Sequence, residues 1–410
     1  MKNRNGWQSL QVGRRGLLKA ATGLGVTFGF TACGGNGGGG SKDPTATLEP
    51  QPTATQAFIS SPVAGYSDPT KWAGRTLSVA CWGGDYQDAQ KQAIFTPFEG
   101  ATGVSIQVKQ ADLGRIKNQI ENEEVSTDLL TVPTEDVLSL ARGDYLTAID
   151  YKVVDATALS DDIVQQYGVG LAYFSTIIVF PTGSSSAPQN WESFWDVPPV
   201  TSGEKPQPDN ARALHKSPVG TLEFALLADG VARDELYPLD VDRAFASLDR
   251  IRASVVDWYE DGKQPVELVV AGQAGMASAW NVRAAQLQVE DEIRVQWYDG
   301  MLSADSWVVP RGAENAEVAM DLINYSTRAT PNANFSRLVP YGPVNPESLK
   351  LLRPDRLAIL PSSAPNRSVQ FVQNFNFWSD NKDQLTEHFD DWLLNEPVTP
   401  AGSPTTGTAG

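Results

Sequence analysis

Two periods of hydrophobic and polar residues alternate along the central part of the chain: short apolar runs of strand type and longer amphipathic stretches of helical type. The expected strands are residues 76–81, 104–109, 128–132, 176–180, 275–280 and 305–309. The expected helices are residues 85–98, 115–122, 137–141, 222–232, 241–253, 284–289 and 314–327. This alternation predicts an α/β fold with a parallel or mixed sheet covered by helices.

Neither end of the chain has this pattern. Residues 34–41 are nearly all glycine, and residues 42–67 and 396–410 are rich in Pro, Thr, Ala and Ser. Because such composition cannot bury a core, we expect a tether over residues 34–74 and a disordered tail over residues 396–410. The roughly 325 residues between them exceed one small core and predict two domains.

The first 33 residues have the features of an export signal. They contain five basic residues and no acidic one, and the apolar stretch over residues 17–32 is short for a membrane-spanning helix. Arg14 and Arg15 resemble a twin-arginine export signal. Cys33 stands in a sequence that resembles a bacterial lipobox, so we expect a lipid there that tethers the protein to the outer face of a membrane. A cleaved signal without lipid and an uncleaved anchor are the alternatives.

Charge and cysteine content exclude several classes of function. The net charge of -17 argues against nucleic-acid binding, which needs a basic surface. The acidity would attract cationic solutes, although it also serves solubility. Cys81 is the only cysteine after Cys33, and the chain has two histidines. We therefore expect no intramolecular disulfide in the mature chain, no Cys/His metal cluster and no cofactor.

Several stretches between Arg75 and Leu393 share their order and spacing with one protein family. They include Leu77–Tyr86, Phe95–Glu99, Asp128–Thr134, Gly220–Glu223, Tyr237–Phe245, Met276–Arg283 and Ala304–Pro310. Through them the chain resembles the extracytoplasmic solute-binding proteins of ABC importers, specifically the spermidine/putrescine-binding family.

This resemblance implies a two-lobed, type II periplasmic-binding-protein fold with a hinge of two crossover segments and a central cleft. Lobe one would comprise residues 75–175 with 303–343, and lobe two residues 176–302 with 344–395. The protein would be a monomer whose cleft closes around a solute, and a membrane permease would read the closed form.

The resemblance also carries ligand-binding residues over to this chain. They are Trp82, either Asp85 or Tyr86, Thr134, Glu135, Trp280, Asp305 and Tyr341. One extra residue in the first turn leaves the choice between Asp85 and Tyr86 open. Carboxylates suit ammonium groups, and aromatic faces suit methylene chains and cations. As alternatives, Trp280 could belong to the core, Glu135 could merely favour a helix start, and Asp305 could be a plain hinge carboxylate.

One departure from the family bears on the ligand. Polyamine binders hold the far amine with a second acidic cluster, but the corresponding residues 214–221 contain no carboxylate, and Arg283 follows Trp280 by three residues. Asp305 for an amine and Arg283 for a carboxylate would suit a zwitterion, because arginine binds carboxylates bidentately. We therefore expect an ω-amino acid such as 4-aminobutyrate, with putrescine or spermidine as rival ligands. A structural ion pair is the alternative role for Arg283.

Two other classes compete with a transport receptor. An exported α/β enzyme acting on a small solute or sugar would need catalytic residues, yet no nucleophile elbow, Walker loop or zinc-protease motif occurs. A carboxylate pair for glycoside hydrolysis has no local signature. A structural or adhesive lipoprotein is the third class. The sequence favours a binding protein that is not an enzyme.

Overall fold

The computed structural model describes residues 58–185, 187–201 and 204–395, which all belong to one packing unit. The predicted export signal with Arg14, Arg15 and Cys33 lies outside the described residues. So do residues 34–57 of the predicted tether and the predicted tail over residues 396–410.

A mixed β-sheet forms the centre of this unit, with the strand order β2-β1-β3-β10-β6-β9-β7-β8. These strands are β1 (Thr76–Cys81), β2 (Ser105–Gln110), β3 (Leu129–Pro133), β6 (Gly168–Pro181), β7 (Arg212–His215), β8 (Val255–Tyr259), β9 (Met276–Trp280) and β10 (Ile293–Pro310). Four short strands pair along β6 or β10: β4 (Leu146–Thr147), β5 (Val164–Gln165), β11 (Gly342–Pro343) and β12 (Phe371–Val372).

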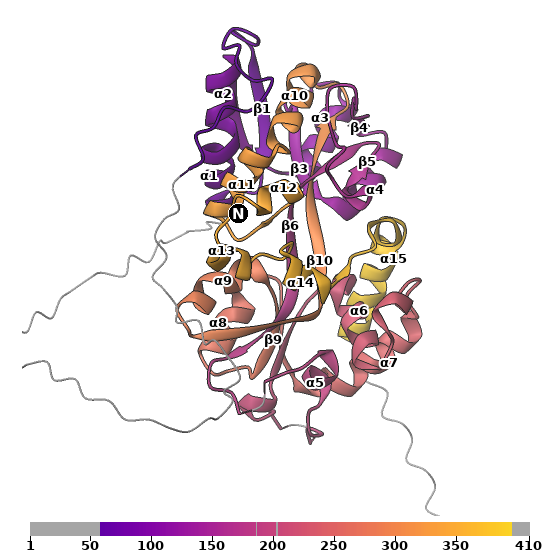
Figure 1. The fold of residues 1–410 in the computed structure, drawn as a ribbon. Coiled ribbons are helices and arrows are strands. Elements are labelled where there is room, and N and C mark those ends of the chain that lie inside the picture. The colour runs from indigo at the N-terminus through magenta and orange to yellow at the C-terminus, as the bar shows by residue number, and fades with distance from the viewer. Residues whose placement is uncertain (1–57, 186, 202–203, 396–410) are drawn as a thin grey trace, which may run out of the picture. The chain divides into compact units, whose positions relative to one another are not determined.

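Strands β6 and β10 connect the two ends of the sheet (Figure 1). They are antiparallel to each other; β10 pairs with β3 through residues 305–308, and β6 pairs with β9 through residues 176–179. The first strand group (β2, β1, β3) and the second strand group (β9, β7, β8) are each internally parallel. The prediction of a mixed sheet is therefore confirmed. The strands expected at 176–180 and 305–309 are parts of longer ones, because antiparallel pairing extends both.

Helices cover both faces of each strand group (Figure 1). Those around the first group are α1 (Gly84–Gln90), α2 (Thr96–Thr102), α3 (Leu113–Glu121), α4 (Val137–Arg142), α10 (Ala316–Ser326) and α11 (Ala329–Leu338). Those around the second are α5 (Trp191–Trp195), α6 (Pro218–Ala228), α7 (Val241–Ile251), α8 (Gln264–Val270), α9 (Asn281–Val289) and α15 (Phe375–Leu394). Short helices α12 (Pro346–Leu349), α13 (Pro354–Ala358) and α14 (Ala364–Ser368) lie between α11 and α15 in sequence.

Alternate residues of strand β1 enter two different cores. Leu77 and Val79 pack with apolar residues of α1, α2 and α10, whereas Ala80 packs with residues of α3 and α4. Successive side chains of a strand point to opposite faces, so an apolar run such as Thr76–Cys81 is buried on both sides. The helix expected over residues 85–98 forms as α1 and α2 joined by the π-helical residues 91–95.

The packed part of the chain begins before Arg75, so the predicted end of the tether at residue 74 lies too late. Asp321 of α10 accepts hydrogen bonds from the Tyr66 hydroxyl at 3.1 Å and from Lys71 Nζ and the Trp72 indole, both at 2.7 Å. Tyr66 is itself buried among core residues. Tyr66 and Trp72, two aromatic residues in or just after a Pro- and Ser-rich stretch, attach this part of the chain to α10. The composition of the stretch did not predict this attachment.

Replacing Asp321 with Ala is expected to lower the free energy of unfolding by about 3 kcal/mol, because a buried acceptor of several hydrogen bonds is removed. Urea unfolding of the variant tests this. Glu317→Ala on the same helix is the control, since Glu317 is exposed and forms a surface ion pair with Arg75. Equal stability of the two variants would contradict the anchoring role of Asp321.

Residues that follow the predicted lobe-one segment 303–343 in sequence still pack against that segment. Leu352 and Leu360 pack with Ala333 of α11, which belongs to the segment 303–343 assigned to lobe one. The predicted boundary at residue 343 thus precedes the last segment that packs on α11. Within residues 58–395, apart from the three that the structure omits, every helix is too short or too polar to span a membrane.

Candidate functional site

The carboxyl ends of strands from both strand groups meet at one cavity of about 780 Å³. Trp82 follows β1, Glu135 follows β3 in the 3₁₀ turn η2 (Thr134–Asp136), His215 ends β7 and Arg283 lies in α9 after β9. Open α/β sheets place their ligands at the carboxyl ends of strands, and the volume suits a small molecule. This cavity is therefore the candidate binding site.

Most of the predicted ligand-binding residues line this cavity. They are Trp82, Asp85, Tyr86, Glu135, Trp280, Arg283, Asp305 and Tyr341. Thr134 does not line it: this residue is buried, and its hydroxyl donates to the carbonyl oxygen of Ala304 at 2.8 Å and contacts Ser306 Oγ at 2.8 Å. Strand β3 ends at Pro133, and the turn that follows directs Thr134 toward β10 and Glu135 toward the cavity.

Strand β10 places Asp305 in the cavity wall together with Ser303 and Met301, because alternate residues of a strand share one face. Asp305 is 5% exposed. The pKa of this carboxyl is raised to about 7, mainly because of burial; the charge of Glu135 also raises it, whereas Tyr86 and Trp82 lower it. The site thus disfavours a bare charge on Asp305 and would favour it once a cation is bound.

An aromatic wall runs from Asp305 toward α9. The ring centroids of Tyr86 and Tyr341 are 4.9 Å apart, those of Tyr341 and Phe174 6.3 Å, and those of Phe174 and Trp280 6.4 Å. A Cβ atom on Gly262 would lie 2.4 Å from Cζ3 of Trp280, so the indole occupies space that only glycine leaves open. Such a wall suits methylene groups and the face of a cation.

Between Asp85 and Tyr86, the two residues that the sequence could not separate, burial makes a distinction. Both line the cavity, but Tyr86 is 6% exposed and packs against Tyr341, whereas Asp85 is exposed in the first turn of α1. Burial is the main cause that raises the pKa of Tyr86, and the charge of Asp305 adds to it. Tyr86 is therefore the neighbour of Asp305.

Arg283 lies in the first turn of α9, and Asn281 fixes the start of this helix. The Asn281 side chain accepts a hydrogen bond from the Ser175 amide at 2.8 Å and donates to the Pro340 carbonyl at 2.9 Å. One residue thereby links β6, α9 and the segment that carries Tyr341. Among the residues that the structure describes, Arg283 is exposed and has no ion-pair partner, which gives no support to a structural ion pair.

Tyr341 lies within the electrostatic reach of both charged candidates. Burial raises the pKa of its hydroxyl, Asp305 raises it further, and Arg283 lowers it. Asp305 and Arg283 both line the same cavity as Tyr341 and both act on this phenol, so they belong to one site.

Several lining residues were not predicted from the sequence. They include Phe174, His215, Lys263, Gln373 and Lys382. Burial lowers the pKa of His215 to about 4, so its ring is neutral at physiological pH. Three acidic side chains (Asp85, Glu135, Asp305) and three basic ones (Lys263, Arg283, Lys382) line the cavity. No cluster of metal-ligating side chains occurs within the described ranges.

Known proteins resemble this chain over most of its folded part. A family model for bacterial extracellular solute-binding proteins matches residues 93–356. The gamma-aminobutyric acid-binding protein of Pseudomonas aeruginosa is 30% identical over 328 residues, which cover 78% of this chain and 91% of that protein. The spermidine/putrescine-binding periplasmic protein of Salmonella typhimurium is 24% identical over 169 residues, 40% of this chain and 45% of that protein.

A solved structure, the GABA receptor Atu4243, superposes with a TM-score of 0.70 at 32% identity and covers 80% of this chain and 100% of its own. The two-lobed, type II fold that the sequence predicted is confirmed by this similarity. So is the predicted resemblance to solute-binding proteins, which the family model supports independently. The chain belongs to the bacterial extracellular solute-binding proteins.

Proposed function

We propose that this protein is the extracytoplasmic receptor of an ABC importer for a small ω-amino acid such as 4-aminobutyrate. This proposal rests mainly on the observation that Asp305 and Arg283 line one cavity together with Tyr341. Asp305 would accept the ligand's ammonium group, and Arg283 would donate to its carboxylate. The aromatic wall of the same cavity would cover the methylene chain.

The charge of the cavity supports a zwitterion over a polyamine. Its three acidic and three basic lining residues balance each other, whereas a dication or trication would need an excess of carboxylates. A relative that carries the name of a gamma-aminobutyric acid-binding protein points the same way. The polyamine rival rests on the spermidine/putrescine-binding relative of lower identity.

The remaining parts of the function follow from this role. The lobes would meet at residues 175–176 and 302–303, within the long strands β6 and β10, and would close around the ligand. A membrane permease would receive the closed, monomeric receptor, and a lipid on Cys33 would keep it near the membrane. The protein would bind its ligand without transforming it.

Arg283→Ala is expected to weaken the affinity for 4-aminobutyrate by about 30-fold or more, because the ligand's carboxylate loses its charged partner. The affinity for putrescine should stay the same or rise. Isothermal titration calorimetry with 4-aminobutyrate, putrescine and spermidine measures both effects. Arg283→Lys should give an intermediate loss, since lysine keeps the charge without the bidentate geometry.

Arg353→Ala serves as the control for this experiment. Arg353 is an exposed arginine that pairs with Asp355 and does not line the cavity, so its loss should change neither affinity. The proposal fails if the unmodified protein binds polyamines alone. It also fails if Arg283→Ala binds 4-aminobutyrate as tightly as the unmodified protein does.

A further inference from the structure

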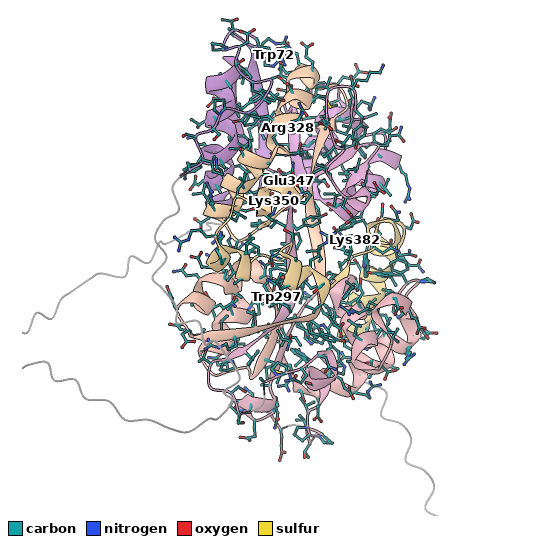
Figure 2. All side chains as sticks on the ribbon, viewed as in Figure 1. Trp72, Trp297, Arg328, Glu347, Lys350 and Lys382 are labelled. Carbon is teal, nitrogen blue, oxygen red and sulfur yellow. The ribbon has the colours of Figure 1, made fainter. Side chains whose placement is uncertain are left out.

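Lys382 contributes a fixed positive charge to the cavity from the far end of the sequence. It belongs to α15 (Figure 2), and its Nζ donates to Asp136 Oδ1 of the turn η2 at 2.6 Å and lies 3.6 Å from Glu135 Oε1. Lys382 and Glu135 both line the cavity. The protein thus places one of its own ammonium groups beside a carboxylate of the binding site.

Lys382 keeps its positive charge in this pair. Glu135 is 9% exposed, and burial raises its pKa, while Lys382 lowers it. For Lys382, burial lowers the pKa, but Glu135 and Asp136 raise it, and the net result is a raised pKa. The ammonium form is therefore the one that faces Glu135 at neutral pH.

Packing holds α15, and with it Lys382, in place. The Trp378 indole, one turn before Lys382, is buried and donates to Glu223 Oε1 at 2.6 Å. Asp380 forms an ion pair with Arg142 of α4. Because α15 is held at both of these positions, the backbone of Lys382 is fixed relative to η2.

Glu135 lies close to Asp305, which is the carboxylate proposed to hold the ligand. Pro133, two residues before Glu135, pairs directly with Asp305 across strands β3 and β10. The charge of Glu135 also raises the pKa of Asp305. Without Lys382, the cavity would present two neighbouring unpaired carboxylates, which is an arrangement suited to a ligand with two ammonium groups.

We propose that Lys382 is a specificity-determining residue. Its ammonium group pairs with the Glu135 carboxylate and so takes the place that the second ammonium group of a diamine would otherwise fill. The site then accepts ligands with a single ammonium group and repels those with two. Selection against the wrong ligand by a built-in like charge is a recognised route to specificity. The inference rests on the proposed function, in which Asp305 holds the ligand's ammonium.

Lys382→Met tests this role, because methionine keeps most of the aliphatic stem and removes the charge. At about pH 8, the variant is expected to bind putrescine about tenfold more tightly than the unmodified protein, since a freed carboxylate gains a charged partner. Butylamine, which has the same carbon chain and one ammonium group, should show no such gain. Calorimetry with the two amines therefore isolates the second ammonium.

Lys350→Met is the matched control. Lys350 pairs with Glu347 at 2.6 Å, so its substitution removes the same charge and frees a carboxylate, but neither residue lines the cavity. This control should leave both amine affinities unchanged. The double variant Lys382→Met with Glu135→Gln should lose the gain for putrescine, because the freed carboxylate is gone.

The inference is overturned if Lys382→Met melts near the temperature of the unmodified protein and binds putrescine no better. Lys382→Gln, which retains a donor toward Asp136, is measured in parallel and decides the matter if the methionine variant does not fold. Failure of the proposed function has a different signature, because the unmodified protein would then bind no ω-amino acid at all.

Discussion

Asp305→Asn is expected to weaken 4-aminobutyrate binding by about 100-fold or more, since the ligand's ammonium would be buried without an opposing charge. Asparagine keeps the size of the side chain, and Asp305 is nearly inaccessible to water, so solvent cannot replace the lost carboxylate. Titration calorimetry at about pH 8 measures the loss. At this pH the carboxyl of the unmodified protein is largely ionised.

Asp85→Asn is the comparison for this prediction. Asp85 also lines the cavity but is exposed, and water screens an exposed charge, so we expect a loss of less than about threefold. Equal losses in the two variants would mean that Asp305 is not the ammonium partner. They would also reopen the choice between Asp85 and Tyr86.

In the ligand-free protein, the same Asp305→Asn substitution is expected to stabilise the fold. The pKa of Asp305 is raised from 3.8 to about 7, so between these pH values the folded state holds a proton that the unfolded state has released. A raised acid pKa means that stability falls as pH rises through this window. Removing the group should therefore raise the free energy of unfolding by up to about 4 kcal/mol above pH 7 and by little below pH 4.

Urea unfolding of both proteins between about pH 4 and pH 8 tests this expectation. The difference between the two proteins is the informative quantity, because other buried groups titrate in the same range. Glu223 has a pKa raised to about 7 and His215 a pKa lowered to about 4, both mainly by burial, and their contributions cancel in the difference. A difference that does not change with pH would contradict the raised pKa.

Saturating 4-aminobutyrate should reverse the order of stability. The ligand supplies the cation that the buried carboxylate lacks, so it stabilises the unmodified protein by mass action and leaves the variant nearly unchanged. For the same reason, the affinity of the unmodified protein should rise as pH increases through about 7. Asp305 would thus lower the stability of the empty receptor and make it responsive to its ligand.

The local hydrophobic pattern was sufficient to predict those helices and strands whose apolar residues follow a clear period or form an unbroken run. The apolar run Thr76–Cys81 corresponds to β1 in its entirety, and the amphipathic stretch 241–253 to α7 at Val241–Ile251. β7 has only four residues, and β8 is half-exposed, so neither has a hydrophobic period strong enough to predict it.

The same distinction holds for the candidate site. Trp82, Glu135 and Arg283 follow predicted strands and Trp280 ends one, so the carboxyl-end rule and the family resemblance could find them from the sequence. Thr134 follows a strand as well, but its hydroxyl is bonded to β10 instead of facing the cavity. A position after a strand limits where a side chain can lie but does not determine the direction in which it points.

The sequence by itself determined the α/β class, the family, and a candidate site built around Asp305 and Arg283, because these depend on local periodicity and on residues at strand ends. Only the tertiary structure decided that Tyr66 and Trp72 bond to Asp321, that strands β6 and β10 extend through both strand groups, and that Lys382 opposes Glu135. Each of these joins residues far apart in the chain, so their contacts depend on packing that no local pattern encodes. The charge balance of the cavity, and the ligand it favours, depend on such contacts.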